Sequence, residues 1–496
     1  MRRPPEGPFV NAALDEARAC VLVVDLDGTM TPTDTLVEGV LHVARQRPAM
    51  LPRVLWAMRE GRAAFKSAVT DAAPLPADGL PYREDLVAYL QTQRSAGRRV
   101  VLATAADQRV ADAVSAHLRV FNETLGTRDG HNLKGEAKLA AIRERFGDNF
   151  EYVGDSRADL PVWRGAKGAL LAGRGSRFRE QVEREVPVVA QFGEAERPGL
   201  AVWARALRLH QWLKNVLVFV PLVTGDTGFG AAPVVAVLMA FLAFSLLASA
   251  TYIVNDLLDL PSDRRHPRKR HRPLAAAKIS IRAAVAAAAG CLAAALGLAL
   301  MLPEKFGLTL LAYWILTTAY STTLKRYVLL DVMTLAVLYT TRIIAGAAVL
   351  SIAVSPWLLA FSATVFLSLA LVKRSSELIT MSQQGRRAAS GRDYNVTDLP
   401  LLQALGSAAA VSAVVVFGLF ISQPSTLARY AQPDLLWGAA LALAYWLGRI
   451  WIKTGRGEMH DDPLVYTLSD RGCRLTLIAI LAITLLARFP ILGLSA

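Results

Sequence analysis

The sequence is poor in cysteine, and its first residues are not those expected of an export signal. Three cysteines, Cys20, Cys291 and Cys473, lie far apart in 496 residues and form no CxxC or Cys/His pattern. A disulfide framework is therefore not expected, which suits a reducing compartment. The N-terminal stretch MRRPPEGPFV lacks the apolar core of a signal peptide. We expect the first domain to stay in the compartment where it is made.

Charged residues make up only 19% of the chain, against 53% hydrophobic residues, and the two kinds are unevenly spread. Residues 1–200 carry charges throughout, whereas long apolar runs alternate with short charged loops from about Leu209 onward. The net charge of +14 is compatible with nucleic-acid binding or with the excess of Lys and Arg in cytoplasmic loops of membrane proteins. The second interpretation fits better, because the basic residues cluster between apolar segments.

The first part of the chain alternates between predicted strands and helices. Val21–Val24 is an apolar run followed at once by the acidic stretch DLDGT, as expected of a buried strand that ends in a loop. Further strands are predicted over 99–103 and around Tyr152, with a helix over 138–146 between them. This alternation predicts a parallel α/β sheet.

Acidic and hydroxyl side chains follow three of these predicted strands, at the edge where open α/β sheets bind ligands. We expect the following residues to converge there: Asp25, Asp27, Thr104, Asp155 and Asp159. Four carboxylates repel one another unless a cation lies among them, and Mg²⁺ prefers oxygen ligands and bridges to phosphate. One carboxylate can then attack phosphorus as a nucleophile.

The DxDGT motif resembles the first motif of the haloacid dehalogenase-like phosphatases. This resemblance, which covers residues 1–195, implies a Rossmann-like α/β domain with a small helical cap at about 35–80. It implies Asp25 as the nucleophile, Asp27 as the general acid and base, and Thr104 as a phosphoryl ligand. Lys138, rather than Lys134, would neutralise developing charge, and Asp155 and Asp159 would hold Mg²⁺. The alternative is a domain that has lost activity and serves as a scaffold.

The remainder, residues 196–496, predicts an all-α integral membrane bundle. Roughly twenty apolar residues span a bilayer, and about nine segments satisfy this rule. They lie near 210–224, 231–254, 280–301, 306–323, 328–350, 355–376, 402–423, 434–452 and 473–494.

The connecting loops differ in charge. One set is rich in Lys and Arg: Arg264, Arg265, Arg268, Lys269, Arg270, Arg272, Lys325, Arg326, Lys373, Arg374, Arg386, Arg387, Lys453 and Arg456. The alternate loops, near Asp226, Glu304, Ser351 and Gln432, are nearly free of Lys and Arg. The first set is therefore predicted to be cytoplasmic. We expect a multi-pass protein of the inner (plasma) membrane whose N-terminal domain and active sites face the cytoplasm.

The stretch NDLLDLPSDRRHP follows the second predicted span. Asp256, Asp259 and Asp263 are spaced by three and then four residues, so on a helix they share one face, with Asn255 alongside. Acids at a membrane helix end are costly unless they serve a function. Such a face can hold Mg²⁺ that grips a diphosphate, and nearby cations can bind further phosphate oxygens. A solvated loop that only sets topology would explain the arginines but not the spaced acids.

This NDxxDxxxD pattern resembles the signature of the UbiA-type intramembrane prenyltransferase superfamily, whose members have about nine helices. The resemblance implies that these acids bind Mg²⁺ and a diphosphate leaving group. Four stretches look like the decaprenyl-phosphate phosphoribosyltransferases of that superfamily: LRLHQWLKNVLVFVPL, NDLLDLPSDRRHPRKRHRPLA, YSTTLKRYVLLDV and RGEMHDDPLVYTLSDR. This likeness implies phosphoribosyl diphosphate as donor and a polyprenyl phosphate as acceptor.

Other residues are candidates for the same site. Asp331 is a candidate metal ligand, although it lacks a DxxxD partner. The candidate substrate-binding residues of this half are Lys214, Asn255, Arg264, Lys269, Arg272, Tyr320, Lys325, Arg342 and Lys373. For each single cation, an interfacial anchor is an equally good interpretation.

The two halves together predict a two-step enzyme. The membrane half would transfer 5-phosphoribose to a polyprenyl phosphate, with Asp256, Asp259 and Asp263 at the catalytic site. The fused phosphatase would remove the 5-phosphate, giving polyprenyl-phosphoryl ribose. Two alternatives stay open. One is an aromatic-acceptor prenyltransferase that uses a prenyl diphosphate, and the other is a phosphatase that the membrane half only anchors.

Overall fold

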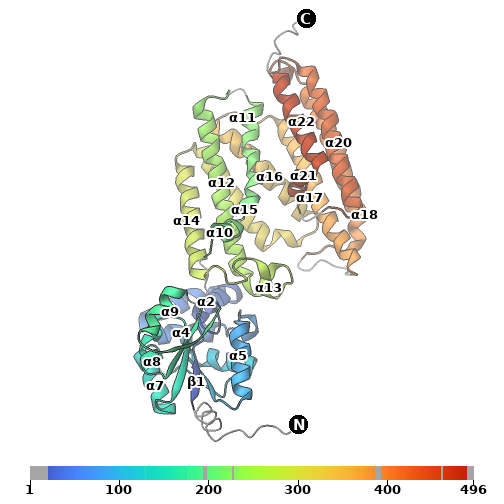
Figure 1. Cartoon of the computed structure of the whole chain (residues 1–496). Coiled ribbons are helices and arrows are strands. Elements are labelled where there is room, and N and C mark those ends of the chain that lie inside the picture. Colours follow the sequence, from blue (N-terminus) through green and yellow to red (C-terminus); the bar gives the residue numbers. More distant parts are fainter. Residues whose placement is uncertain are drawn as a thin grey trace. The chain divides into compact units, whose positions relative to one another are not determined.

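The computed structural model describes residues 20–128, 130–173, 175–193, 198–225, 228–385, 392–459 and 462–488 (Figure 1). The chain divides into two compact units. The first unit comprises Met1–Leu207 and Tyr252–Ala288, and the second comprises Arg208–Thr251 and Ala289–Ala496. Each unit is described by itself.

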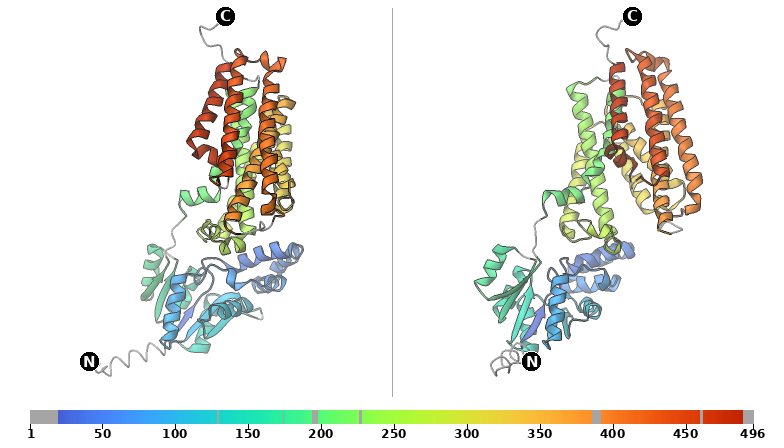
Figure 2. Two further views of the ribbon diagram at one scale, coloured as in Figure 1. Left: turned by 90° about the vertical axis from the view of Figure 1, so that its right-hand side faces the viewer. Right: turned by 45° about the vertical axis from the view of Figure 1, so that its right-hand side comes forward.

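The first unit is built on a parallel six-stranded sheet with the order β3-β2-β1-β4-β5-β6 (Figures 1 and 2). The strands are β1 Val21–Val24, β2 Val100–Asp107, β3 Glu123–Thr127, β4 Phe150–Gly154, β5 Gly168–Ala172 and β6 Val188–Phe192. This confirms the predicted α/β fold. Strand β1 lies between β2 and β4, so the later strands are added on both sides of β1. In open α/β sheets, ligands bind at the point where the strand order reverses in this way.

Alternating side chains of the strands form separate cores on the two faces of the sheet. Leu22 and Val24 pack into one core, whereas Val21 and Val23 pack into the other. Successive side chains of a strand point to opposite faces, so an unbroken apolar run is needed where helices cover both. The helices after the cap are α5 Glu84–Ser95, α6 Gln108–Leu118, α7 Glu136–Phe146, α8 Leu160–Arg164 and α9 Ser176–Glu183.

The segment predicted as a cap is helical. Its elements are α2 Thr35–Gln46, α3 Leu51–Trp56 and α4 Arg62–Ala72, with 3₁₀ turns η1 Pro48–Met50, η2 Ala57–Glu60 and η3 Ala77–Gly79. Asp34 caps α2, because its carboxylate accepts hydrogen bonds from the amides of Leu36 and Val37. Val43, Val54 and Val69 are buried in a small core of the cap's own.

The rest of the chain is helical. Its α-helices are α10 Leu200–Ala206, α11 Val220–Thr224, α12 Ala231–Leu258, α13 Leu260–Arg265, α14 Ile281–Leu300, α15 Glu304–Thr322, α16 Leu330–Val349, α17 Pro356–Gln383, α18 Leu399–Ile421, α19 Pro424–Leu427, α20 Leu436–Gly455, α21 Pro463–Ser469 and α22 Arg471–Arg488. The 3₁₀ helices are η4 Arg157–Asp159, η5 Leu209–Phe219, η6 Lys269–His271, η7 Leu324–Arg326, η8 Val396–Asp398 and η9 Pro433–Leu435.

Six helices of the described chain are long and apolar enough to cross a membrane: Ala231–Leu258, Ile281–Leu300, Leu330–Val349, Pro356–Gln383, Val396–Ile421 and Pro433–Gly455. The chain is a multi-pass membrane protein, but the predicted count of nine spans is not confirmed. Two other predicted spans correspond to long helices, α15 and α22, whose first turns carry Glu304, Lys305, Arg471 and Arg474.

The predicted span at 210–224 is not one α-helix. It is the 3₁₀ helix η5 followed by the short α11, and Pro221 in the first turn of α11 cannot donate a backbone hydrogen bond. Some residues used to assign the loops lie outside the described chain, namely Asp226, Arg386 and Arg387, and so do residues 489–494 of the last predicted span.

Candidate functional site

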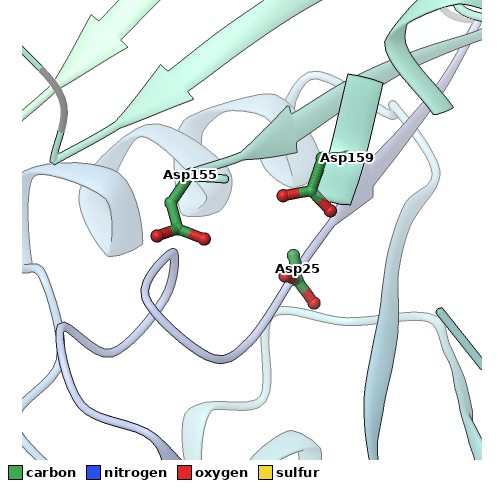
Figure 3. Close-up of side chains that lie close together, drawn as sticks. All are labelled: Asp25, Asp155 and Asp159. Atoms are coloured by element: carbon green, nitrogen blue, oxygen red, sulfur yellow. The ribbon is translucent and has the colours of Figure 1, made fainter. Parts of the chain in front are cut away.

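Three carboxylates lie together at the ends of β1 and β4. Asp25, Asp155 and Asp159 each offer an oxygen atom, and these atoms lie within 4.8 Å of one another. Figure 3 shows the three side chains grouped beyond the strand ends. Asp25 directly follows β1, and Asp155 directly follows β4, so the parallel pairing of the two strands brings them to the same edge. Hard oxygen ligands in such a group fit Mg²⁺.

Lys138 of α7 contacts this group and is almost fully buried. Its Nζ atom donates to Asp25 Oδ1 at 2.9 Å and to the Tyr152 hydroxyl at 2.8 Å, and it lies 3.6 Å from Asp159 Oδ1. Burial lowers the pKa of Lys138, but the carboxylates of Asp25 and Asp159 outweigh it, so its pKa is raised. The ammonium group is therefore charged and placed to neutralise negative charge on a phosphoryl group.

Two further residues hold Asp159 in place. Its Oδ2 atom accepts from the backbone amide of Ser156 at 3.0 Å and from the Ser156 hydroxyl at 2.8 Å. Its Oδ1 atom accepts from the Tyr152 hydroxyl at 2.8 Å.

Gly28 of the DxDGT motif has a φ of +81°, and a Cβ atom there would overlap the carboxylate of Asp155. Glycine is thus required at this position for backbone and space alike.

Asp27 and Thr104 complete this part of the site. Asp27 Oδ1 accepts from the backbone amide of Thr35, at the start of cap helix α2, at 2.7 Å. Burial and then the neighbouring Asp34 carboxylate raise the pKa of Asp27 to about 7. A carboxyl group of this kind suits a general acid and base. Thr104 is fully buried, and its hydroxyl accepts from the amide of Ala106 at 3.0 Å.

The acids of the NDxxDxxxD motif are arranged differently. Helix α12 ends at Leu258 and α13 begins at Leu260, with Pro261 in its first turn, so the three acids do not share one continuous helix. Asp256 and Asp263 are buried, whereas Asp259 is exposed. Within the described residues, the three motif acids do not form a group as tight as that of Asp25.

Arg272 joins the two buried motif acids. Its Nη1 atom lies 3.1 Å from Asp256 Oδ1 and 2.6 Å from Asp263 Oδ2. Asp263 Oδ1 is buried without a hydrogen-bond partner among the described residues, and the ammonium group of Lys269 lies 3.7 Å from it. A buried carboxylate oxygen with no donor is costly, and it is the kind of atom that a cation satisfies. These residues therefore fit Mg²⁺ as well.

Arg264, another predicted phosphate ligand, has protein partners within the first unit. Its Nη2 atom lies 2.6 Å from Glu38 Oε1, and its Nη1 atom donates to the carbonyl oxygen of Gly79 at 2.9 Å. The side chains of Arg264 and Glu38 are both largely buried, at 9% and 5% exposure. Asn255 is half-buried at the end of α12.

In the second unit, Asp331 belongs to an ion-pair network in which it and Arg374 are fully buried. Arg374 pairs with it, and the Tyr394 hydroxyl donates to its Oδ1 atom at 2.9 Å. Arg374 also pairs with Glu377, which in turn accepts from Arg392 at 2.6 Å. Among the predicted residues nearby, Tyr320 hydrogen-bonds with Arg392, and Lys325 lies in a shallow cavity with Arg326 and Arg392.

A second polar cluster of this unit contains Lys214 and Arg342. Lys214 pairs with Asp462, and Arg342 donates to Asn215 Oδ1 at 2.8 Å and to the Tyr313 hydroxyl at 3.0 Å. Lys373 is half-buried and makes no hydrogen bond or ion pair with the described residues.

Four of these partners were not predicted as site residues: Tyr152, Ser156, Tyr394 and Asp462. The acidic pair in RGEMHDDPLV was the one signal that pointed to Asp462.

Comparison with known proteins assigns both halves. Residues 217–469 match the UbiA prenyltransferase family, and residues 22–164 match the haloacid dehalogenase-like hydrolases. Protein y4nM of Sinorhizobium fredii is 40% identical over 92% of this chain and 88% of its own length. The decaprenyl-phosphate phosphoribosyltransferase of Corynebacterium glutamicum is 31% identical over 54% of this chain and 80% of its own length.

One solved structure aligns with a similar share of this chain. A UbiA homolog from Archaeoglobus fulgidus, bound to DMAPP and Mg²⁺, covers 57% of this chain and 99% of its own, with 18% identity and a TM-score of 0.44. The family match of the second half and the long alignment with y4nM decide the assignment. The chain belongs to the UbiA prenyltransferase family and carries a haloacid dehalogenase-like hydrolase domain at its N-terminal end.

Proposed function

We propose that the membrane half transfers 5-phosphoribose from phosphoribosyl diphosphate to a polyprenyl phosphate, and that the N-terminal domain then removes the 5-phosphate. The name of the Corynebacterium glutamicum relative supports the donor and the acceptor. One observation carries the transferase site. Asp256 and Asp263 are buried side by side on Arg272, and an oxygen of Asp263 has no hydrogen-bond donor among the described residues.

In the transfer step, the bond between the anomeric carbon and the diphosphate breaks, and a bond to an oxygen of the lipid phosphate forms. Asp256, Asp259 and Asp263 would hold Mg²⁺, which neutralises diphosphate when bound. Arg272 and Lys269 are placed beside the acids to bind further diphosphate oxygens. The acceptor is already an anion, so the step needs no general base. Asp331, Lys214, Asn255, Arg264, Tyr320, Lys325, Arg342 and Lys373 are further candidates for metal or substrate binding.

In the hydrolytic step, Asp25 attacks phosphorus and displaces the sugar oxygen, which takes a proton from Asp27. Asp27 then accepts a proton from the water that cleaves the acyl phosphate, which releases phosphate and restores Asp25. Lys138 and the hydroxyl of Thr104 stabilise the charge on the phosphoryl oxygens. Asp25, Asp155 and Asp159 would hold Mg²⁺, which offsets the repulsion between two anions.

The fusion and the location follow from the same proposal. A product released from the first site meets a second site held at high local concentration by the covalent link. Phosphoribosyl diphosphate is water-soluble, and the basic loops are predicted to be cytoplasmic. We therefore place both active sites on the cytoplasmic side of the plasma membrane.

Mass spectrometry of lipids made by the purified full-length protein tests the proposal. With polyprenyl phosphate, phosphoribosyl diphosphate and Mg²⁺, we expect polyprenyl-phosphoryl ribose. The Asp25→Asn variant should instead accumulate a lipid that is heavier by one HPO₃ group. Identical products from wild type and Asp25→Asn would rule out the second step.

Matched variants separate the alternatives. Asp259→Ala should abolish lipid products, whereas Asp434→Asn, which changes an exposed acid elsewhere in the membrane half, should not. Unchanged lipids in Asp259→Ala would mean that the membrane half is only an anchor. Transfer of a prenyl chain to an aromatic acid would favour the other alternative.

A further inference from the structure

A cavity of about 590 Å³ lies between the cap and the strand ends of the N-terminal domain. Asp25 and Asp27, the proposed nucleophile and acid, form part of its lining, and cap helices α2 and α4 contribute further residues. Volumes of this size hold small ligands larger than a phosphoryl group alone. The cavity therefore has room for the part of the substrate that is not transferred.

Four cations line this cavity in addition to Lys138, and one of them, Arg282, pairs with Asp34. Arg62 and Lys66 are four residues apart on α4 and so lie on one face of the helix, and Lys134 comes from the loop before α7. The Lys66 Nζ atom donates to the Ala105 carbonyl oxygen and, at 2.7 Å, to Asn132 Oδ1. Lys66 is thus fixed beside the C-terminal part of β2, next to Thr104.

The other three cations are not neutralised by carboxylates in direct contact. The hydrogen-bond acceptors of Lys66 are a carbonyl and an amide oxygen, both of which are uncharged. Arg62 and Lys134 are exposed and make no side-chain hydrogen bond or ion pair with residues that the structure describes. Lys134 and Arg62 repel Lys66, while the carboxylates of Asp27 and Asp34 attract it more strongly, although neither forms an ion pair with it. Bringing an anion among them would relieve that repulsion.

The acids of the cavity already have other partners. Asp25 pairs with Lys138, Asp107 pairs with Arg109, and Asp34 caps α2 and pairs with Arg282. Asp27 accepts from the amide of Thr35, and Asp159 accepts from Tyr152 and Ser156. The cavity is therefore divided into a catalytic part, where Lys138 serves Asp25, and a cationic part formed by Arg62, Lys66 and Lys134.

We propose that the cationic part binds a second phosphate group of the substrate while the first is attacked by Asp25. The domain would then act on sugar phosphates that carry two phosphate groups, one transferred and one retained. This inference rests on the proposed function, whose lipid product has a 5-phosphate and a phosphodiester on one pentose. A soluble sugar bisphosphate presents the same two anions, so the lipid-linked and soluble sources need separate assays.

Steady-state hydrolysis by the full-length protein in detergent tests the proposal. The substrates are ribose 5-phosphate, ribose 1,5-bisphosphate and farnesyl-phosphoryl-5-phosphoribose. We expect wild type to have a kcat/KM about tenfold or more higher for at least one two-anion substrate than for ribose 5-phosphate, as one charged hydrogen-bonded contact provides. Equal values for all three substrates would overturn the proposal.

The Arg62→Gln/Lys134→Gln variant removes two exposed charges, so it should fold normally. We expect its kcat/KM for the preferred two-anion substrate to fall about tenfold through KM, with ribose 5-phosphate changed less than about twofold. Arg47→Gln/Arg53→Gln removes two exposed charges of the same cap outside this cavity and should change neither substrate. Equal losses for one- and two-anion substrates would contradict the second-phosphate site.

Two variants of Lys66 are compared, Lys66→Met and the conservative Lys66→Arg. Lys66→Arg should retain more of the two-anion preference than Lys66→Met, because the charge is kept. If the two variants lose that preference equally, the role of Lys66 is limited to its hydrogen bonds with Ala105 and Asn132, and its assignment to the phosphate site is wrong. Preference for ribose 1,5-bisphosphate with no cleavage of the lipid would keep the subsite but refute the second step of the proposed function.

Discussion

The two acidic sites of the chain differ in how their carboxylates are held. At the strand ends, oxygen atoms of Asp25, Asp155 and Asp159 lie within 4.8 Å of one another. Lys138 donates a hydrogen bond to Asp25, and the Tyr152 hydroxyl donates one to Asp159. At the end of α12, Asp256 and Asp263 are joined by Arg272, and Asp259 is exposed.

The difference shows two ways to keep buried carboxylates close. In the first site, Lys138 contacts Asp25 and Asp159, and an oxygen atom of each of the three acids lies within 4.8 Å of the others, so the metal ligands are already grouped. In the second site, an arginine lies between the acids themselves. A cation that binds there must share the carboxylates of Asp256 and Asp263 with the Arg272 guanidinium, because both neutralise the same charge.

The largest expected effect comes from removing the nucleophile of the preassembled site. Asp25→Asn should lower phosphatase activity by about a thousandfold or more, because the amide cannot attack phosphorus. Transfer to the lipid should be retained. Phosphate release and lipid transfer, each measured in the same preparation, check this. Asp148→Asn, an exposed acid of the same domain, should behave as wild type.

Asp263→Asn should remove transfer by about a hundredfold or more, because a buried ligand oxygen for the leaving-group metal is lost. Hydrolysis of p-nitrophenyl phosphate should change little. Loss of both activities together would contradict the assignment of the two sites to separate reactions.

Arg272→Gln should have an intermediate effect. We expect the KM for phosphoribosyl diphosphate to rise about tenfold, since a charge-assisted contact to the diphosphate is lost. Arg282→Gln removes an exposed arginine in the same region and serves as the control. An unchanged KM in Arg272→Gln would mean that this arginine only pairs with the acids.

Metal titration compares the two sites directly. After chelation, both activities should return with Mg²⁺, and the phosphatase should be half-restored at a concentration several-fold lower, since its ligands are already grouped. Rate measurements over a Mg²⁺ series give both values. The reverse order would break the comparison.

The smallest expected effect is that of Tyr152→Phe. Losing the hydroxyl removes one donor to Asp159 and one acceptor for Lys138, so phosphatase kcat should fall roughly three- to tenfold. Thermal unfolding followed alongside the rates checks that the domain is intact. An unchanged kcat would show that Lys138 alone positions the acids.

Much of the N-terminal domain could be predicted from the sequence. The run Val21–Val24 ends at the DxDGT acids, and the parallel pairing of β1 and β4 then puts Asp25 and Asp155 at one edge. Such local patterns fix strands and their ends. The hydrogen bonds of Tyr152 and Ser156 follow from tertiary packing, which periodicity does not encode.

The membrane half was less predictable. Hydropathy located six spans, but it placed an α-helix at 210–224, where the chain forms η5 and α11. The spacing of Asp256, Asp259 and Asp263 predicted one helical face, whereas α12 ends at Leu258. Ion pairs such as Arg374 with Asp331 join residues far apart in sequence, so spacing within one segment cannot show them.

The fate of the ribose carbon atoms tests the account most directly. Full-length protein is given polyprenyl phosphate, Mg²⁺ and phosphoribosyl diphosphate labelled in the ribose, and the organic phase is counted. We predict label in the lipid fraction for wild type and for Asp434→Asn, and almost none for Asp263→Asn. Label that stays entirely in the aqueous phase with active wild-type protein would contradict the proposed transfer.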